Sequence, residues 1–222
     1  SKFCLGTMMF GRSANEADSI AIVHAALERG VNFIDTANAY SAGASERFVG
    51  AALQGGRRAS VVLATKAFFP QDQNDPNARG LSRRHLIEAC EASLKRLKTD
   101  WIDLYQVHRP QSDIPIDETL RALDDLIRQG KVRYIGTSNF AAWMIVEGLW
   151  TSERLHLNRF VSEQPPYSMA NRLAERELFP MAQAHEIAIL PWSPLWGGQL
   201  TGKYRREQPP PPDARVNFSP LT

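Results

Sequence analysis

Four side chains that can take part in proton transfer follow short apolar runs of this sequence. They are a carboxylate, a phenol, an ammonium and an imidazole: Asp35, Tyr40, Lys66 and His108. The apolar runs at residues 31–34, 61–65 and 102–107 have the length and composition of buried strands. A parallel barrel brings the carboxyl ends of all its strands to one rim, so we expect these side chains to meet there. The pattern predicts a site that delivers a proton.

Strand-like and helix-like segments alternate along the chain and would position these residues. Asn15 is expected to cap the first helix and Gly30 to end it. Alternation of this kind is typical of parallel βαβ units, and no G-x-G-x-x-G follows the first strand, which disfavours a Rossmann fold. We therefore expect an α/β fold, a (β/α)8 TIM barrel of which about seven βα units are present. The expected strands are 3–7, 31–34, 61–65, 102–107, 132–135, 160–163 and 187–192, and the expected helices 15–30, 45–53, 82–97, 115–129, 141–150 and 174–185.

Length and composition narrow the class of protein. The 222 residues suit one barrel domain, with an irregular proline-rich tail over residues 205–222. A net charge of +2 is too small to favour nucleic acid or an anionic membrane. No run approaches the roughly 18 apolar residues of a membrane span, and Cys4 and Cys90 lack the spacing of metal ligands. We expect a cytoplasmic protein with two free thiols and no metal.

Motifs at the strand ends resemble those of the aldo-keto reductase family. They are G-V-N-F-I-D-T-A-N-A-Y at 30–40, A-T-K at 64–66, D-L-Y-Q-V-H at 103–108, G-T-S-N-F at 136–140 and W-S-P-L at 192–195. The similarity runs from about Gly6 to Tyr204 in the family's order. It is closest to the bacterial general aldo-keto reductases and the β subunits of potassium channels. The resemblance implies a reductase that converts a small aldehyde or ketone to an alcohol.

The chemistry of the four residues agrees with this resemblance. A tyrosine hydroxyl, with an ordinary pKa of about 10, is a poor acid unless a cation stabilises its phenolate. Lys66 can supply that charge, Asp35 can pair with Lys66, and His108 can donate a hydrogen bond to the substrate oxygen. The family assigns the role of acid to Tyr40. Taken singly, each residue also has a structural explanation, such as packing, a turn cap or a loop position.

The resemblance implies NADP (NADPH) as the cofactor, and three neutral polar side chains suit its nicotinamide amide. Ser138, Asn139 and Gln164 combine donors and acceptors, as a carboxamide requires. In the resembling family these positions hold the nicotinamide amide, and an aromatic residue at the position of Trp192 faces its ring, although Trp192 could also be a core residue. The family's remaining cofactor contacts fall on Gly6, Thr7, Met8, Ser193, Leu195, Gly198 and Lys203.

The loop after the last strand has a second interpretation. Residues 197–203 form G-G-Q-L-T-G-K, which is nearly a P-loop. However, Tyr204 stands where a P-loop has its magnesium-binding Ser or Thr, so a dinucleotide phosphate is favoured over a nucleoside triphosphate. Apolar side chains that either line a substrate pocket or belong to the core are Met8, Phe10, Phe68, Phe69 and Trp196.

The sequence also departs from the family pattern. We find no eighth strand, no closing helices and no N-terminal hairpin in it. The region that binds the adenosine end of the cofactor in the family is not found either, so the choice between NADPH and NADH stays open. Three explanations would account for the missing elements: disordered or deleted segments are left out of the sequence, the chain is a fragment, or another element closes the barrel. Two other interpretations remain open: a nucleotide-binding regulatory subunit with little turnover, or a truncated, inactive fragment. The first is disfavoured, because the channel β subunits of the resembling family carry a different residue at the position of His108. The oligomeric state is not predicted.

Overall fold

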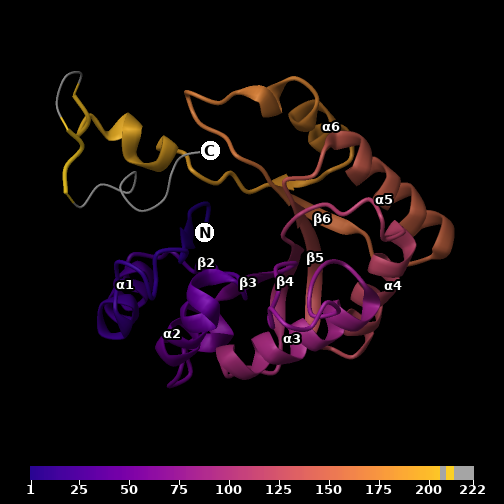
Figure 1. Cartoon of the computed structure of the whole chain (residues 1–222), viewed down its shortest axis with the longest axis horizontal. Coiled ribbons are helices and arrows are strands. Elements are labelled where there is room, and N and C mark those ends of the chain that lie inside the picture. Colours follow the sequence, from indigo (N-terminus) through magenta and orange to yellow (C-terminus); the bar gives the residue numbers. More distant parts are fainter. Residues whose placement is uncertain (206–208, 213–222) are drawn as a thin grey trace.

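The strands form one curled parallel sheet with helices on its outer side. A computed structural model of the chain describes residues 1–205 and 209–212. Within these residues seven strands lie in sequence order, and each pairs in parallel with the next. Figure 1 shows the helices following one another around the outside of the strands. The strands are β1 (Cys4–Gly6), β2 (Phe33–Asp35), β3 (Val62–Ala67), β4 (Ile102–Val107), β5 (Val132–Ser138), β6 (Phe160–Gln164) and β7 (Ala188–Ile189).

The helices agree with the predicted segments, with differences at their ends. They are α1 (Glu16–Glu28), α2 (Ala44–Ala52), α3 (Arg83–Leu97), α4 (Ile116–Arg128), α5 (Ala142–Leu155) and α6 (Leu178–Ala184). The Asn15 side chain accepts a hydrogen bond from the backbone N–H of Asp18, which confirms the predicted cap of α1. The segment predicted as one helix over 174–185 is instead a short 3-10 turn, η3 (Leu173–Glu175), followed by α6. The other 3-10 segments are η1 (Tyr40–Gly43), η2 (Arg57–Ser60) and η4 (Trp196–Thr201).

Alternation along the strands separates an inner face from an outer one. Lys66 of β3 lies beside Gln106 of β4 in the register, and both point to the inner face. Thr65 points outward, where its hydroxyl donates to the carboxylate of Glu46 in α2 at 2.6 Å. The Tyr105 hydroxyl likewise donates to a backbone carbonyl of α3. The apolar core therefore lies between the sheet and the helices, while polar side chains gather inside the curl.

The sheet is open within the described residues. β1 and β7 stand at the two ends of the strand order, and each pairs with one neighbour. This is the arrangement expected for seven strands of a (β/α)8 barrel. β7 is shorter than the predicted strand over 187–192, because Pro191 has no N–H to donate and the contact beyond it is a single bridge between Pro166 and Trp192. Most of the tail predicted over 205–222 lies outside the described residues.

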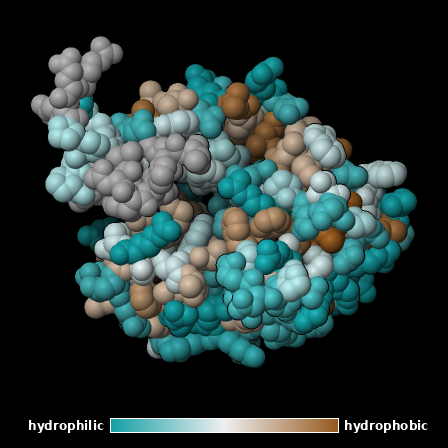
Figure 2. Space-filling view, viewed as in Figure 1, coloured by the Kyte–Doolittle hydropathy of each residue, from teal (hydrophilic) through white to brown (hydrophobic). Residues whose placement is uncertain are grey.

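One face of the molecule is mostly polar (Figure 2). Figure 2 shows hydrophilic side chains over most of one face, with smaller hydrophobic patches between them. Among residues 1–205 and 209–212, no helix is long and apolar enough to cross a membrane. Cys4 is exposed and Cys90 is buried, and both are free thiols.

Candidate active site

A buried ion pair lies at the centre of the inner face. The Lys66 ammonium donates to Asp35 Oδ2 at 2.5 Å and to the backbone carbonyl of Thr36 at 2.8 Å. The Lys66 side chain is fully buried and that of Asp35 is 10% exposed. β2 and β3 are neighbours in the sheet, so their adjacent carboxyl ends bring these two side chains together, as the sequence predicted. The pair is held in one geometry by its surroundings.

The second oxygen of Asp35 is also occupied. Gln106 Nε2 donates to Asp35 Oδ1 at 2.9 Å, and Gln164 Nε2 donates to the same oxygen at 3.1 Å. The two amides also meet each other, because Gln164 Nε2 lies 3.3 Å from Gln106 Oε1. Sequence reasoning missed Gln106. The available signal was its place two residues before His108, which puts both side chains on the same face of β4.

Tyr40 and His108 complete this group, and we call Asp35, Tyr40, Lys66 and His108 the tetrad. Lys66 Nζ lies 3.2 Å from the Tyr40 hydroxyl, at the start of η1. The rings of Tyr40 and His108 pack edge to face with centroids 5.8 Å apart. The Phe69 ring also packs edge to face against the imidazole, with centroids 5.0 Å apart. The four residues that the sequence singled out therefore lie in one cluster.

The tetrad combines one cation, one anion and two neutral groups. Burial opposes the charge on Lys66, but the Asp35 carboxylate and the Tyr40 hydroxyl outweigh it and raise the pKa of Lys66. Burial, with the positive charges of Lys66 and Arg109, lowers the pKa of His108 to about 3. The imidazole is therefore neutral at pH 7, and its buried Nδ1 has no hydrogen-bond partner among the described residues. A neutral imidazole can still donate one hydrogen bond.

Three polar residues from the ends of β5 and β6 adjoin the tetrad, and we call Ser138, Asn139 and Gln164 the polar triad. Ser138 Oγ donates to the backbone carbonyl of Gln164 at 2.9 Å. Asn139 Nδ2 donates to Ser138 Oγ at 2.8 Å and to the backbone carbonyl of His108 at 3.3 Å. Gln164 reaches Asp35, as described above. The structure thus joins the polar triad to the tetrad by direct hydrogen bonds.

The remaining predicted cofactor residues form two further groups. The first group lies in the loop that follows β7 and contains η4, and it consists of Trp192, Ser193, Leu195, Gly198 and Lys203. Backbone hydrogen bonds tie Trp192 to Pro165 and Tyr167, beyond the end of β6. Leu195 is 55% exposed and Lys203 is exposed.

The first-strand residues lie on the other side of the tetrad. Gly6 pairs with Asp35 in the register of β1 and β2. Thr7 is fully buried, and its hydroxyl bonds with the backbone carbonyl of Asp35 and with Ser45 in α2. Met8 is half-buried. The Thr7 side chain therefore faces the α2 layer.

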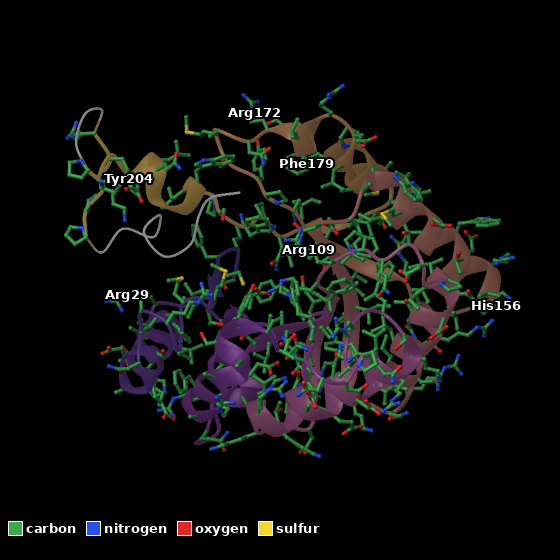
Figure 3. All side chains as sticks on the ribbon, viewed as in Figure 1. Arg29, Arg109, His156, Arg172, Phe179 and Tyr204 are labelled. Atoms are coloured by element: carbon green, nitrogen blue, oxygen red, sulfur yellow. The ribbon has the colours of Figure 1, made fainter. Side chains whose placement is uncertain are left out.

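A positively charged side chain lies next to the His108 imidazole in the sequence. Arg109 directly follows His108, is exposed, and is one cause of the lowered pKa of His108. Figure 3 shows Arg109 near the middle of the view, between the strands and the segment that carries Arg172 and Phe179. Among the described residues, no cluster of three or more His, Cys, Asp and Glu side chains could hold a metal ion.

Comparison with known proteins places the chain in a family. The model of the Aldo/keto reductase family matches residues 2–220. The chain therefore belongs to the aldo-keto reductase family, as its motifs predicted.

Three relatives illustrate the similarity. The chain is 45% identical to "Uncharacterized oxidoreductase YrpG" of Bacillus subtilis (strain 168), over 91% of this chain and 65% of the relative. It is 40% identical to "Probable voltage-gated potassium channel subunit beta" of Arabidopsis thaliana, over 89% of this chain and 60% of the relative. It is 37% identical to "Aldo-keto reductase AMT2" of Alternaria alternata, over 91% of this chain and 60% of the relative. The chain spans less than two thirds of the length of these relatives.

Proposed function

We propose that this chain is an NADPH-dependent oxidoreductase that reduces an aldehyde or a ketone to an alcohol, with the proton supplied by Tyr40. The observation that carries the proposal is the buried Lys66 ammonium, fixed by Asp35 and 3.2 Å from the Tyr40 hydroxyl. A cation in that place stabilises a phenolate, and a phenol becomes a useful acid only when its phenolate is stabilised. Membership of the aldo-keto reductase family supports this reading.

The proposed proton transfer uses each member of the tetrad. The carbonyl oxygen of the substrate accepts hydrogen bonds from the Tyr40 hydroxyl and from the neutral imidazole of His108. As hydride adds to the carbonyl carbon, the C=O π electrons move to the oxygen, which takes the proton from Tyr40. Lys66 stabilises the phenolate that remains, and Asp35 holds Lys66 in place. Solvent then returns a proton to Tyr40.

The polar triad fits the amide of a nicotinamide cofactor. Within the described residues, the side-chain hydrogen bonds of Asn139 and Gln164 use their nitrogen atoms. Their carbonyl oxygens are therefore suited to accept from the carboxamide NH2. The Ser138 hydroxyl, which donates to the backbone carbonyl of Gln164 here, would turn away from it to donate to the carboxamide oxygen. When bound, the reduced nicotinamide supplies the hydride for the reaction. Trp192 would face the ring. Gly6, Met8 and the backbone of Thr7, whose side chain faces α2, would contact the cofactor at the end of β1.

The loop after β7 would bind the phosphates. Ser193, Leu195 and Gly198 would contact the pyrophosphate, and Lys203 supplies positive charge beside it. Gly198 has φ of 99°, a conformation that glycine adopts readily, and an added Cβ would lie 3.1 Å from the Lys203 side chain.

Turnover of the purified chain tests the proposal. Incubation with NADPH and a panel of aldehydes and ketones should consume the absorbance of the reduced nicotinamide, with an alcohol as product. Tyr40→Phe should lower kcat by about 10² to 10⁴-fold while the Kd for NADPH changes little, because only the proton donor is removed. Turnover of Tyr40→Phe at the wild-type rate would exclude Tyr40 as the acid.

One relative favours a second candidate function. The 40% identity to a protein named as a probable potassium-channel β subunit suits a regulatory subunit that binds nucleotide with little turnover. Tight NADPH binding without consumption of any carbonyl compound, together with a co-purifying membrane protein, would support this second function. The neutral His108 beside Tyr40 favours the enzyme.

A further inference from the structure

A buried carboxyl group lies directly behind the polar triad. Glu163 precedes Gln164 in β6, and the alternation of the strand turns its side chain to the outer face of the sheet. It is fully buried, and its Oε2 has no hydrogen-bond partner among the described residues. A carboxyl group in such a place is costly unless hydrogen bonds compensate it. Its presence therefore needs a reason.

The turn at the end of β5 lies against this carboxyl group. Glu163 Oε1 accepts from the backbone N–H of Phe140 at 3.2 Å. The backbone N–H of Asn139 and the hydroxyl of Thr137 also lie close enough to lower the pKa of the carboxyl group against the effect of burial. The Thr137 hydroxyl itself donates to the backbone carbonyl of Ser162 at 3.3 Å. Glu163 therefore binds the turn that ends β5 from its outer side.

The turn has an unusual backbone conformation. Asn139 has φ of 62°, in the left-handed region that few residues other than glycine adopt. Its N–H also lies 3.3 Å from the backbone carbonyl of Gln164. This conformation sets the direction of the Asn139 side chain, which bonds to Ser138 Oγ and to the carbonyl of His108.

We propose that Glu163 is a positioning residue for the nicotinamide amide. By accepting from the turn, it holds Asn139 in the left-handed conformation and so directs the Ser138 and Asn139 side chains toward the cofactor. The inference rests on the proposed function, because it assumes that the polar triad binds the amide. Glu163 touches neither substrate nor cofactor and acts only through the turn.

Two variants separate the hydrogen bonds from the volume of the side chain. Glu163→Gln keeps one carbonyl oxygen at the same place, and Glu163→Met keeps the length but accepts no such bond. Glu46→Gln is the matched control, because Glu46 is also fully buried and bonded to Thr65 and Arg96, away from the polar triad. Any general loss of stability should appear in this control as well.

The experiment measures the Kd of NADPH and of its 3-acetylpyridine analogue by quenching of tryptophan fluorescence. The analogue has a methyl group where the carboxamide has NH2, so it lacks the hydrogen bonds to Asn139 and Gln164. We expect Glu163→Met to weaken NADPH binding about tenfold and the analogue less than about twofold, as the loss of a hydrogen bond predicts. Glu163→Gln should stay within about threefold of the wild type, and Glu46→Gln should match the wild type.

The outcomes distinguish this proposal from the proposed function. If the wild type binds NADPH and Glu163→Met binds it equally well, Glu163 does not position the amide. Equal weakening of NADPH and of the analogue would show a general structural role and also overturn the proposal. A wild type that does not quench at millimolar NADPH would overturn the proposed function itself, and the positioning role with it.

Discussion

At the residue scale, Lys66 and Asp35 depend on each other because both are buried. Lys66→Met removes the ammonium and leaves the Asp35 carboxylate with only the amides of Gln106 and Gln164. Breaking a buried pair by removing one partner typically costs about 3–5 kcal/mol. We expect Lys66→Met to lose about this much free energy of unfolding, measured by urea denaturation.

A double variant provides the control for this prediction. Lys66→Met combined with Asp35→Asn removes both charges, so it should regain most of the stability that Lys66→Met loses. If the single and double variants unfold at the same urea concentration, the uncompensated charge of Asp35 is not the cause. A loss below about 1 kcal/mol in Lys66→Met would contradict the prediction directly.

The lowered pKa of His108 gives a second prediction at this scale. With a pKa of about 3, the imidazole stays neutral from pH 5 to pH 9. Its ring proton resonances should therefore not shift between pH 5 and pH 8 in an NMR titration. In Lys66→Met the midpoint should rise, because Lys66 is one of the causes of the lowered pKa. A wild-type midpoint between pH 6 and pH 7 would show that His108 is charged in part of the working range.

Sequence reasoning singled out residues whose chemistry stands out, which the structure brings together, and missed those that support them. Asp35, Lys66 and His108 carry groups that are unusual at the end of an apolar strand. Gln106 and Glu163 lie inside strands, where an amide or a carboxyl group has no spacing of its own, and only the strand register reveals what each one touches.

At the element scale, the raised pKa of Glu163 makes stability depend on pH. Burial raises its pKa from 4.5 to about 7. Between these values the folded chain keeps a proton that the unfolded chain releases, so the free energy of unfolding falls as pH rises and then levels off above pH 7. The contribution is on the order of 3 kcal/mol. Urea denaturation at pH 5 and pH 8 should show Glu163→Gln losing less stability than the wild type over this range. An identical pH dependence in both proteins would contradict it.

Helix ends were predicted well where a side chain marks them. Asn15 and Ser82 cap α1 and α3 by accepting from backbone N–H groups three residues later. α5 has no such signal at its end and continues five residues past the predicted end at 150, because the pattern of apolar residues alone does not fix a terminus. The same limit explains the split of the segment predicted over 174–185.

At the scale of the whole molecule, the curl of the sheet converts distance in sequence into proximity. The tetrad comes from β2, β3, η1 and the residue after β4, and the polar triad from β5, the residue after it and β6. Gln164 reaches Asp35 although 129 residues separate them in the chain. The order of the strands alone predicted this meeting at one rim. The hydrogen bonds between the two groups depend on the tilt of each side chain, which the sequence does not specify.

The unpaired edge of the open sheet should affect how the chains associate. Within the described residues β1 has one unpaired edge, and exposed edges of this kind promote association between chains. Cys4 is exposed in β1 on the face that carries Asp35 and Lys66, so Cys4→Lys places an inward-pointing charge at the edge, which opposes strand pairing. In sedimentation measurements under reducing conditions, we expect the average molecular mass of the wild type to increase with protein concentration. Cys4→Lys should need about tenfold higher protein concentration to reach the same average mass. Cys4→Ser, which removes the thiol without adding charge, should behave as the wild type does. A wild type that stays monomeric at every concentration, or a Cys4→Ser that matches Cys4→Lys, would show that the edge of β1 does not drive association.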